Sequence, residues 1–144
     1  MSLTAKIVAS LLVLSSLQGC TTPLAQGQKQ ELSIYEEKGL VVHDKNVAAA
    51  AALGVIPGAG YFYTGHYVLG VTTIPLWVFL GPLWMPFDTA AAAESRNYYA
   101  TKIQVERSKA ADLMALDQKL ENKQLTYEQH LREQRVVEAK YSAY

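Results

Sequence analysis

The stretch GVIPGAGYFYTGHY, residues 54–67, decides how the middle of this chain folds. It holds four glycines, one proline and three consecutive aromatic residues, and it lies between two apolar runs. Two interpretations compete for such a pattern. The stretch is either a glycine-rich loop that cradles a phosphate or a turn that joins two helices.

Residues 60–67 have glycines at the spacing of a phosphate-binding loop but lack the other parts of that loop. A phosphate-binding loop needs Lys directly after the second glycine, and then Ser or Thr for the magnesium ion. His66 and Tyr67 stand at those two places. The dinucleotide-binding fingerprint fails as well, because Tyr63 stands where its third glycine belongs. The pattern therefore favours a turn between two helices.

The turn lies inside an uncharged block, residues 46–87, that contains no Asp, Glu, Lys or Arg. Before the turn, the run VAAAAALGVI predicts a helix with Asp44 or Asn46 as its N-cap and with Pro57 at its end. After the turn, residues 68–87 include three prolines and predict a kinked helix followed by an irregular turn. A helix of a soluble domain needs a polar face, so this block indicates burial in a membrane or against a partner.

Small residues recur at helical spacing through the first part of this block, at Ala50, Gly54 and Gly58. Such spacing predicts a smooth helix face on which another helix can pack closely. The alternative is a plain alanine-rich helix in a soluble core.

The same stretch resembles the hairpin of the bacterial TM-two domain family. That hairpin carries a pattern like Pro-Gly-x-Gly-x-Phe-Tyr-x-Gly, a further glycine and a second apolar helix. The resemblance covers about residues 48–102 and rests on Pro57, Gly58, Gly60, Phe62, Tyr63, Gly65 and Gly70. It implies two membrane-embedded helices with a short connection and no catalytic residues. Whether the block spans a bilayer, dips into one leaflet or packs on a protein stays open.

The N-terminal segment indicates the compartment. Residues 1–19 combine Lys6 with a short apolar run, and they predict a secretory signal peptide that is too short to span a membrane. The sequence LQGC that ends at Cys20 resembles the lipobox of bacterial lipoproteins. That resemblance implies cleavage between Gly19 and Cys20 and acylation of Cys20. The alternative is an ordinary signal peptide with an incidental cysteine.

Residues 20–45 are predicted to form a lipidated polar tether. The residues just after Cys20 include no Asp, which such lipoproteins often carry when they stay in the inner membrane. The expected location is therefore the cell envelope, anchored in the outer membrane and facing the periplasm, with the inner membrane as the alternative.

Residues 88–144 carry most of the charge and predict a long amphipathic helix, with Asp88 and Thr89 at its start, followed by a C-terminal helical hairpin. Residues 125–129, LTYEQ, resemble a SHOCT motif, a short C-terminal helical hairpin found on many bacterial membrane-linked proteins. Thr126 and Gln129 also form a capping box, whereas Lys123 stands where that motif commonly has glycine. The resemblance implies a module for interaction or oligomerisation.

The sequence thus predicts an all-α protein: a small membrane-associated helical hairpin, a long amphipathic helix and a C-terminal helical hairpin. The net charge of zero gives no basic patch for nucleic acid. The three histidines lie far apart and no nucleophile motif is present, so we expect no enzyme, metal site, cofactor or small-molecule substrate.

The expected function is that of a membrane-anchored envelope lipoprotein with a structural or protein-interaction role. Its partners are the lipid bilayer, through Cys20 and the uncharged block, and a protein or a second copy, through residues 88–144. One alternative is an accessory subunit of an envelope transport or assembly complex. Another is a soluble periplasmic helical domain that only its lipid tethers to the membrane.

Overall fold

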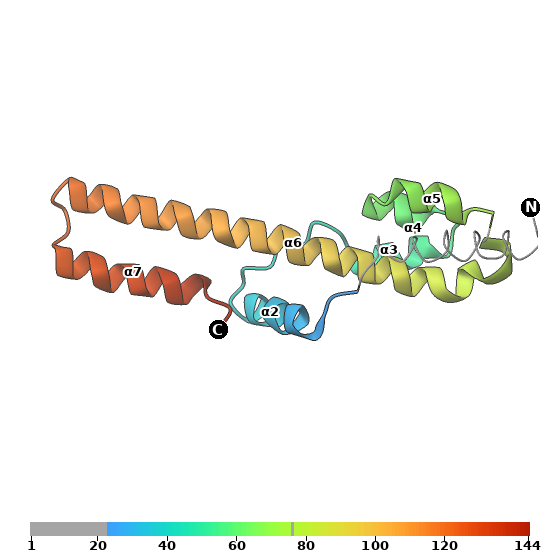
Figure 1. Ribbon diagram of the computed structural model, residues 1–144, viewed down its shortest axis with the longest axis horizontal. Coiled ribbons are helices and arrows are strands. Elements are labelled where there is room, and N and C mark those ends of the chain that lie inside the picture. Colours follow the sequence, from blue (N-terminus) through green and yellow to red (C-terminus); the bar gives the residue numbers. More distant parts are fainter. Residues whose placement is uncertain (1–22, 76) are drawn as a thin grey trace, which may run out of the picture. The chain divides into compact units, whose positions relative to one another are not determined.

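The computed structural model describes residues 23–75 and 77–144. Over these residues the chain is helical and contains no strand, which confirms the predicted all-α class. The signal peptide predicted for residues 1–19, its cleavage site at Gly19 and the lipidation site at Cys20 lie outside the described residues. The helices, labelled as in Figure 1, are α2 (Gln26–Glu37), α3 (Val47–Gly54), α4 (Ala59–Thr64), α5 (Tyr67–Thr73), α6 (Trp77–Glu121) and α7 (Tyr127–Tyr141).

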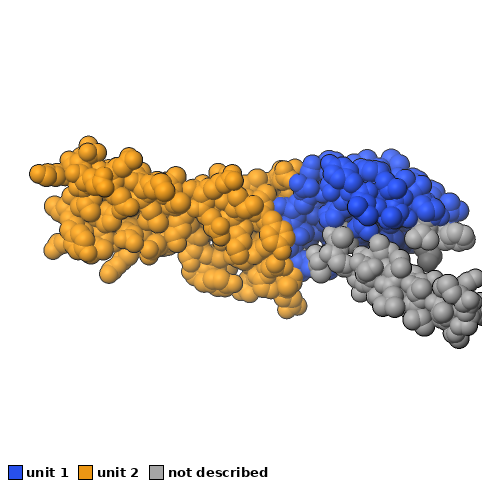
Figure 2. Space-filling model, turned by 45° about the horizontal axis from the view of Figure 1, so that its top comes forward, with its two compact units in different colours: residues 1–24, 45–96 blue, residues 25–44, 97–144 orange. Residues whose placement is uncertain are grey.

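The chain divides into two compact units, which Figure 2 shows in different colours. Among the described residues, unit 1 comprises 23–24, 45–75 and 77–96, and unit 2 comprises 25–44 and 97–144. Helix α6 contributes its first part to unit 1 and the remainder to unit 2. The predicted boundary lies at residue 88, where the charges begin. The structure places it after Arg96, because α6 packs within unit 1 as far as that residue.

Unit 1 begins with three short helices in place of the predicted two-helix hairpin. Helix α3 starts at the predicted N-cap, where the Asn46 side chain accepts a hydrogen bond of 2.9 Å from the Ala49 amide. The chain then turns at Gly58 and again at Gly65, whose φ angles are 70° and 81°. These left-handed conformations favour glycine, and they separate α4 from its neighbours on either side.

Helix α6 overturns two expectations for the second half of the block. It begins at Trp77 and passes through Pro82 and Pro86, where the sequence analysis expected an irregular turn. Asp88 and Thr89 consequently lie inside the helix instead of capping its start. Tertiary packing overrides the low helix propensity of the prolines, because Met85 and Thr89 are buried in unit 1 on one face of α6.

Unit 2 combines α2 with the second part of α6 and with α7, which runs back beside it (Figure 1). Its core contains Tyr35 of α2, Val105 of α6, and Tyr141 and Ala143 at the end of the chain. Residues 20–45 were predicted to form a polar tether. Helix α2 instead folds into unit 2, where Tyr35 is buried and Leu40 and Val41 pack against the same cluster.

The predicted capping box at the start of α7 is confirmed. The Thr126 hydroxyl accepts from the Gln129 amide at 3.3 Å, and the Gln129 side chain accepts from the Thr126 amide at 2.9 Å.

Among the described helices, none combines the length and the apolar character that a membrane crossing requires.

Candidate functional site: the glycine motif and apolar surface of unit 1

The structure brings most of the predicted hairpin residues together inside unit 1, where the glycines allow close approach of backbone segments. A Cβ atom added at Gly58 would lie 2.5 Å from the carbonyl oxygen of Gly70. A Cβ atom added at Gly70 would lie 3.0 Å from the ring of Phe62. Gly58, Phe62 and Gly70 therefore form one contact, although they come from α4 and α5 and from the turn before them.

Two further glycines allow α3 and α4 to pack against α6 at Thr89. An added Cβ at Gly60 would meet Thr89 Cγ2 at 2.6 Å, and one at Gly54 would meet Thr89 Oγ1 at the same distance. The Thr89 hydroxyl donates to the carbonyl oxygens of Ala50 and Met85, both at 2.8 Å. Small residues and a buried hydroxyl thus hold these helices together, as the small-residue spacing at positions 50 and 54 predicted.

The remaining motif residues lie at the edge of this core. Pro57 is exposed in the turn between α3 and α4. The Tyr63 hydroxyl accepts a hydrogen bond of 3.0 Å from the Asn46 amide, and the Lys45 ammonium lies 4.9 Å from the centre of the Tyr63 ring. Gly65 packs beneath the Arg96 guanidinium. Tyr63 therefore fixes the start of α3, and Gly65 leaves room for Arg96.

Charged side chains of unit 1 bond to the glycine motif itself. The buried Tyr61 hydroxyl donates to Asp88 Oδ2 at 2.7 Å, and its burial together with this bond raises the pKa of Tyr61 well above its ordinary value. Arg96 Nη1 donates to the carbonyl oxygen of Thr64 at 2.8 Å. Asp88 and Arg96, which follow the uncharged block in the sequence, therefore bond to residues of α4.

Sequence reasoning missed the central place of Thr89, because a Thr after Asp and before an alanine run is typical of a helix start. An alanine-rich run follows the apolar residues directly, without a glycine or proline after residue 86. This continuity was the signal that one helix continues through residue 89. The contact between Tyr61 and Asp88 had no local signal, because the two residues are far apart in the chain.

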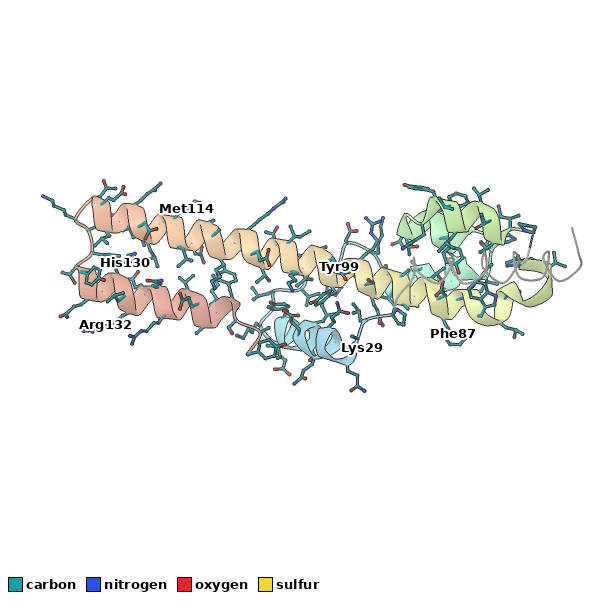
Figure 3. The ribbon with its side chains drawn as sticks, viewed as in Figure 1. Lys29, Phe87, Tyr99, Met114, His130 and Arg132 are labelled. Atoms are coloured by element: carbon teal, nitrogen blue, oxygen red, sulfur yellow. The ribbon has the colours of Figure 1, made fainter. Side chains whose placement is uncertain are left out.

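Unit 1 exposes large apolar side chains on α5, on the first part of α6 and in the turn after α3. We call this set the apolar surface. Its members are Val55, Ile56, Tyr67, Val68, Val71, Ile74, Val78, Leu83, Trp84 and Phe87, all exposed. Figure 3 shows Phe87 projecting from α6 on the side away from α4 and α5. An apolar set of this size on one compact unit marks a contact with lipid or with another protein.

Unit 2 has the opposite character, because polar bonds join its helices. Glu31 of α2 accepts from Tyr98 at 2.6 Å, and this bond is the main cause that raises the pKa of Tyr98 to about 12. Lys38 donates to the carbonyl oxygens of Ala139 and Ser142, both at 2.8 Å. The C-terminal end of α7 is thereby attached to the end of α2.

Further polar contacts join α6 to α7. Asp112 accepts from Lys140 at 3.0 Å and from Tyr141 at 2.8 Å, and these two bonds lower the pKa of Asp112. His130 lies 2.8 Å from Asp117 and is mostly buried between the helices. Among the described residues no group of three or more His, Cys, Asp or Glu side chains is arranged to hold a metal ion.

No protein-family model, curated protein or solved structure matches the chain. The resemblances to lipoproteins, to the TM-two domain family and to the SHOCT motif therefore stay predictions that rest on the residues quoted for each.

Proposed function

We propose that this protein is a lipid-anchored lipoprotein of the bacterial envelope with a structural or protein-interaction role. The observation that carries the proposal is the contrast between the two units. Unit 1 exposes the apolar surface and is free of charge from residue 46 to residue 87, whereas most charged residues of the chain lie in unit 2. One unit suits an apolar environment, and the other suits water and a protein partner.

The anchor in this proposal is Cys20 with acyl chains on its thiol and amino group. It is the single cysteine of the chain, and it ends the LQGC sequence. One acyl chain holds a protein to a bilayer only marginally, at about 0.8 kcal/mol per buried methylene, so several chains make the attachment firm. The proposed location is the outer membrane, with the protein facing the periplasm.

The interaction module in this proposal is the hairpin formed by α6 and α7 in unit 2. Its outward faces carry charges together with scattered apolar side chains such as Met114 and Val136. Arg132 projects from α7 toward solvent (Figure 3), and its guanidinium lies 3.8 Å from the Glu128 carboxylate. Mixed surfaces of this kind are typical of transient protein interfaces.

The test of the anchor is metabolic labelling with an alkyne analogue of palmitate, followed by detection of the purified chain. The unaltered protein incorporates the label, and Cys20→Ala does not. Thr21→Asp, which keeps Cys20, retains the label and moves the protein from the outer-membrane to the inner-membrane fraction of a density gradient. An unlabelled Cys20 in the unaltered protein would contradict the proposal.

A second candidate function is that of an accessory subunit in an envelope transport or assembly complex. The apolar surface favours it, because membrane helices of a larger complex would cover such side chains equally well. The mass of the protein purified in detergent separates the two functions. A stable monomer or homo-oligomer supports the first function. The second function is supported if the protein aggregates alone but stays dispersed when one complex co-purifies with it.

A further inference from the structure

Helix α5 exposes aliphatic side chains and packs small or hydroxyl residues inward, which is the opposite of the usual arrangement. The side packed inside unit 1 carries Gly70 and Thr73 together with Leu69. The opposite side carries Val68 and Val71, whose side chains are 73% and 60% exposed. A helix on the surface of a water-soluble domain buries its aliphatic residues and exposes its polar ones. This helix therefore faces surroundings that are more apolar than its own core.

The first part of α6 repeats this arrangement. Its inward side carries Gly81, Met85 and Thr89, all buried. Its outward side carries Leu83 and Phe87, which are 70% and 78% exposed. In these two elements the inward side combines small or hydroxyl residues with Leu69 or Met85, and the outward side carries large apolar residues, as in helices that pack in lipid.

Two polar groups near the apolar surface have partners within unit 1. The exposed Thr72 hydroxyl donates to the carbonyl oxygen of Val68 at 2.8 Å, within α5. The Trp77 indole donates to the carbonyl oxygen of Val55 at 3.2 Å. Hydrocarbon offers no hydrogen bonds, so every polar group next to it needs an internal partner. A protein interface instead has a polar rim, with about one hydrogen bond per 100–200 Å².

The lengths of these elements fit one leaflet. Helix α5 has seven residues, and the uncharged start of α6, residues 77–87, is only slightly longer. At about 1.5 Å per residue, α5 is about 10 Å long and residues 77–87 about 16 Å, so neither covers the roughly 30 Å of a hydrocarbon core and each is close to the depth of one leaflet or shorter. Among the described helices none could cross a membrane.

The position of the anchor agrees with this depth. Leu24 is buried and belongs to unit 1, four positions after Cys20 in the sequence. Even a fully extended chain covers only about 14 Å over that separation. Acyl chains on Cys20 therefore enter the bilayer beside unit 1, so the anchor and the apolar surface meet the same leaflet.

We propose that the apolar surface of unit 1 inserts into one leaflet of a phospholipid bilayer, without crossing it, and forms a second attachment beside the acylated Cys20. Only the acyl anchor in this inference depends on the proposed function; the insertion of the apolar surface does not. Trp84 and Tyr67, which have polar atoms on aromatic rings, lie at the headgroup level, where such side chains collect.

The test uses the full mature chain with Cys20→Ser, so that no acyl chain contributes to binding. The chain is synthesised in the presence of vesicles of phosphatidylethanolamine with a minor share of phosphatidylglycerol, which lets unit 1 meet lipid as it folds. Flotation of the vesicles reports binding. Both tryptophans of the chain, Trp77 and Trp84, lie in unit 1, so quenching of their fluorescence by brominated lipid reports the depth of unit 1.

The expected result is flotation with the vesicles and quenching that is strongest for bromine near the headgroup end of the acyl chain. Val71→Asp lowers the vesicle-bound fraction about tenfold, because a carboxylate in hydrocarbon is costly. Ile103→Asp, at a similarly exposed aliphatic residue in unit 2, leaves binding unchanged. Circular dichroism of both variants confirms that they keep their helices.

Three results would overturn the inference: no flotation of the Cys20→Ser chain, equal loss of binding in the two Asp variants, or absence of quenching. The parent chain could instead form a dimer and show no quenching. If Val71→Asp then produced a monomer, a second copy of the chain would be the partner of the apolar surface. Palmitate labelling of the unaltered protein is independent of all these readouts. A labelled Cys20 with no vesicle binding by the Cys20→Ser chain would leave the proposed function intact and the inference wrong.

Discussion

At the residue scale, Lys123 shows how the hairpin of unit 2 turns. Its φ angle is 56°, in the left-handed region. Its amide donates to the carbonyl oxygen of Leu120 at 2.9 Å, and the Gln124 amide donates to that of Lys119 at 2.8 Å. These two bonds form a Schellman motif at the end of α6, with Lys at the position where glycine is preferred.

Replacing Lys123 with glycine is expected to stabilise unit 2. A residue with a Cβ atom pays about 1 kcal/mol or more in the left-handed conformation, and glycine does not. Lys123→Gly therefore raises the free energy of unfolding by about 1 kcal/mol, measured by urea denaturation followed by circular dichroism. The control is Lys109→Gly inside α6, which loses about 1 kcal/mol because glycine is a poor helix former. Equal losses in both variants would show that the turn is not strained.

Gly60 tests the close packing in unit 1. Its added Cβ would lie 2.6 Å from Thr89 Cγ2 and 3.0 Å from the backbone of Gly54, so Gly60→Ala forces the helices apart. The expected loss is about 1–3 kcal/mol, measured by thermal unfolding in detergent micelles. Gly27 in α2 has nothing within 4 Å of the same position, so Gly27→Ala keeps or slightly raises stability.

A second variant separates this contact from a general effect of alanine. Thr89→Ser removes Cγ2 but keeps the hydroxyl that donates to Ala50 and Met85. We expect the double variant Gly60→Ala with Thr89→Ser to regain part of the loss. If the effects of the two changes were additive, the strain would not lie at the contact between Gly60 and Thr89.

At the element scale, α2 is attached to α6 through Tyr98 and Glu31. The hydrogen bond to Glu31 raises the pKa of Tyr98 from 10.0 to about 12. The folded state thus favours the protonated phenol, and this contribution to stability is complete below pH 10 and disappears as the pH rises through about 12. Tyr35 shifts in the same direction, chiefly through burial.

The prediction is a loss of stability of unit 2 between pH 10 and about 12 that depends on Tyr98. Tyr98→Phe has no phenol to ionise, so its urea midpoint changes less with pH over this interval than that of the unaltered protein. Tyr127, which is exposed at the start of α7, provides the control, because Tyr127→Phe leaves the pH dependence unchanged. The same slope in all three proteins would contradict the assigned bond.

The elements also show which parts of the fold could be predicted from the sequence. The Asn46 cap and the Thr126 capping box depend on neighbouring residues, and these predictions are confirmed. Helix α2 buries Tyr35 in the core of unit 2, and α6 buries Met85 and Thr89 as it continues through Pro82 and Pro86. Both are tertiary effects that override local composition, so the polar tether and the turn at the prolines were wrong.

At the scale of the whole molecule, unit 2 is built from two segments that unit 1 separates in the sequence. Residues 25–44 supply α2, and residues 97–144 supply the rest, with Tyr35 packed against Val105, Tyr141 and Ala143. The segment that follows the proposed anchor is therefore structural. A free tether would leave unit 2 indifferent to changes in it.

Tyr35→Ala tests whether unit 2 depends on this segment. Removal of a buried aromatic side chain costs about 3–5 kcal/mol, whereas Tyr127→Ala at an exposed site changes stability by no more than about 0.5 kcal/mol. Hydrogen exchange locates the effect: the amides of α7 lose protection in Tyr35→Ala, and the amides of α3 and α4 in unit 1 keep theirs. If α7 stayed as protected as in the unaltered protein, residues 25–44 would act as a tether after all. The anchor would then hold unit 2 on a flexible chain instead of attaching directly to its core.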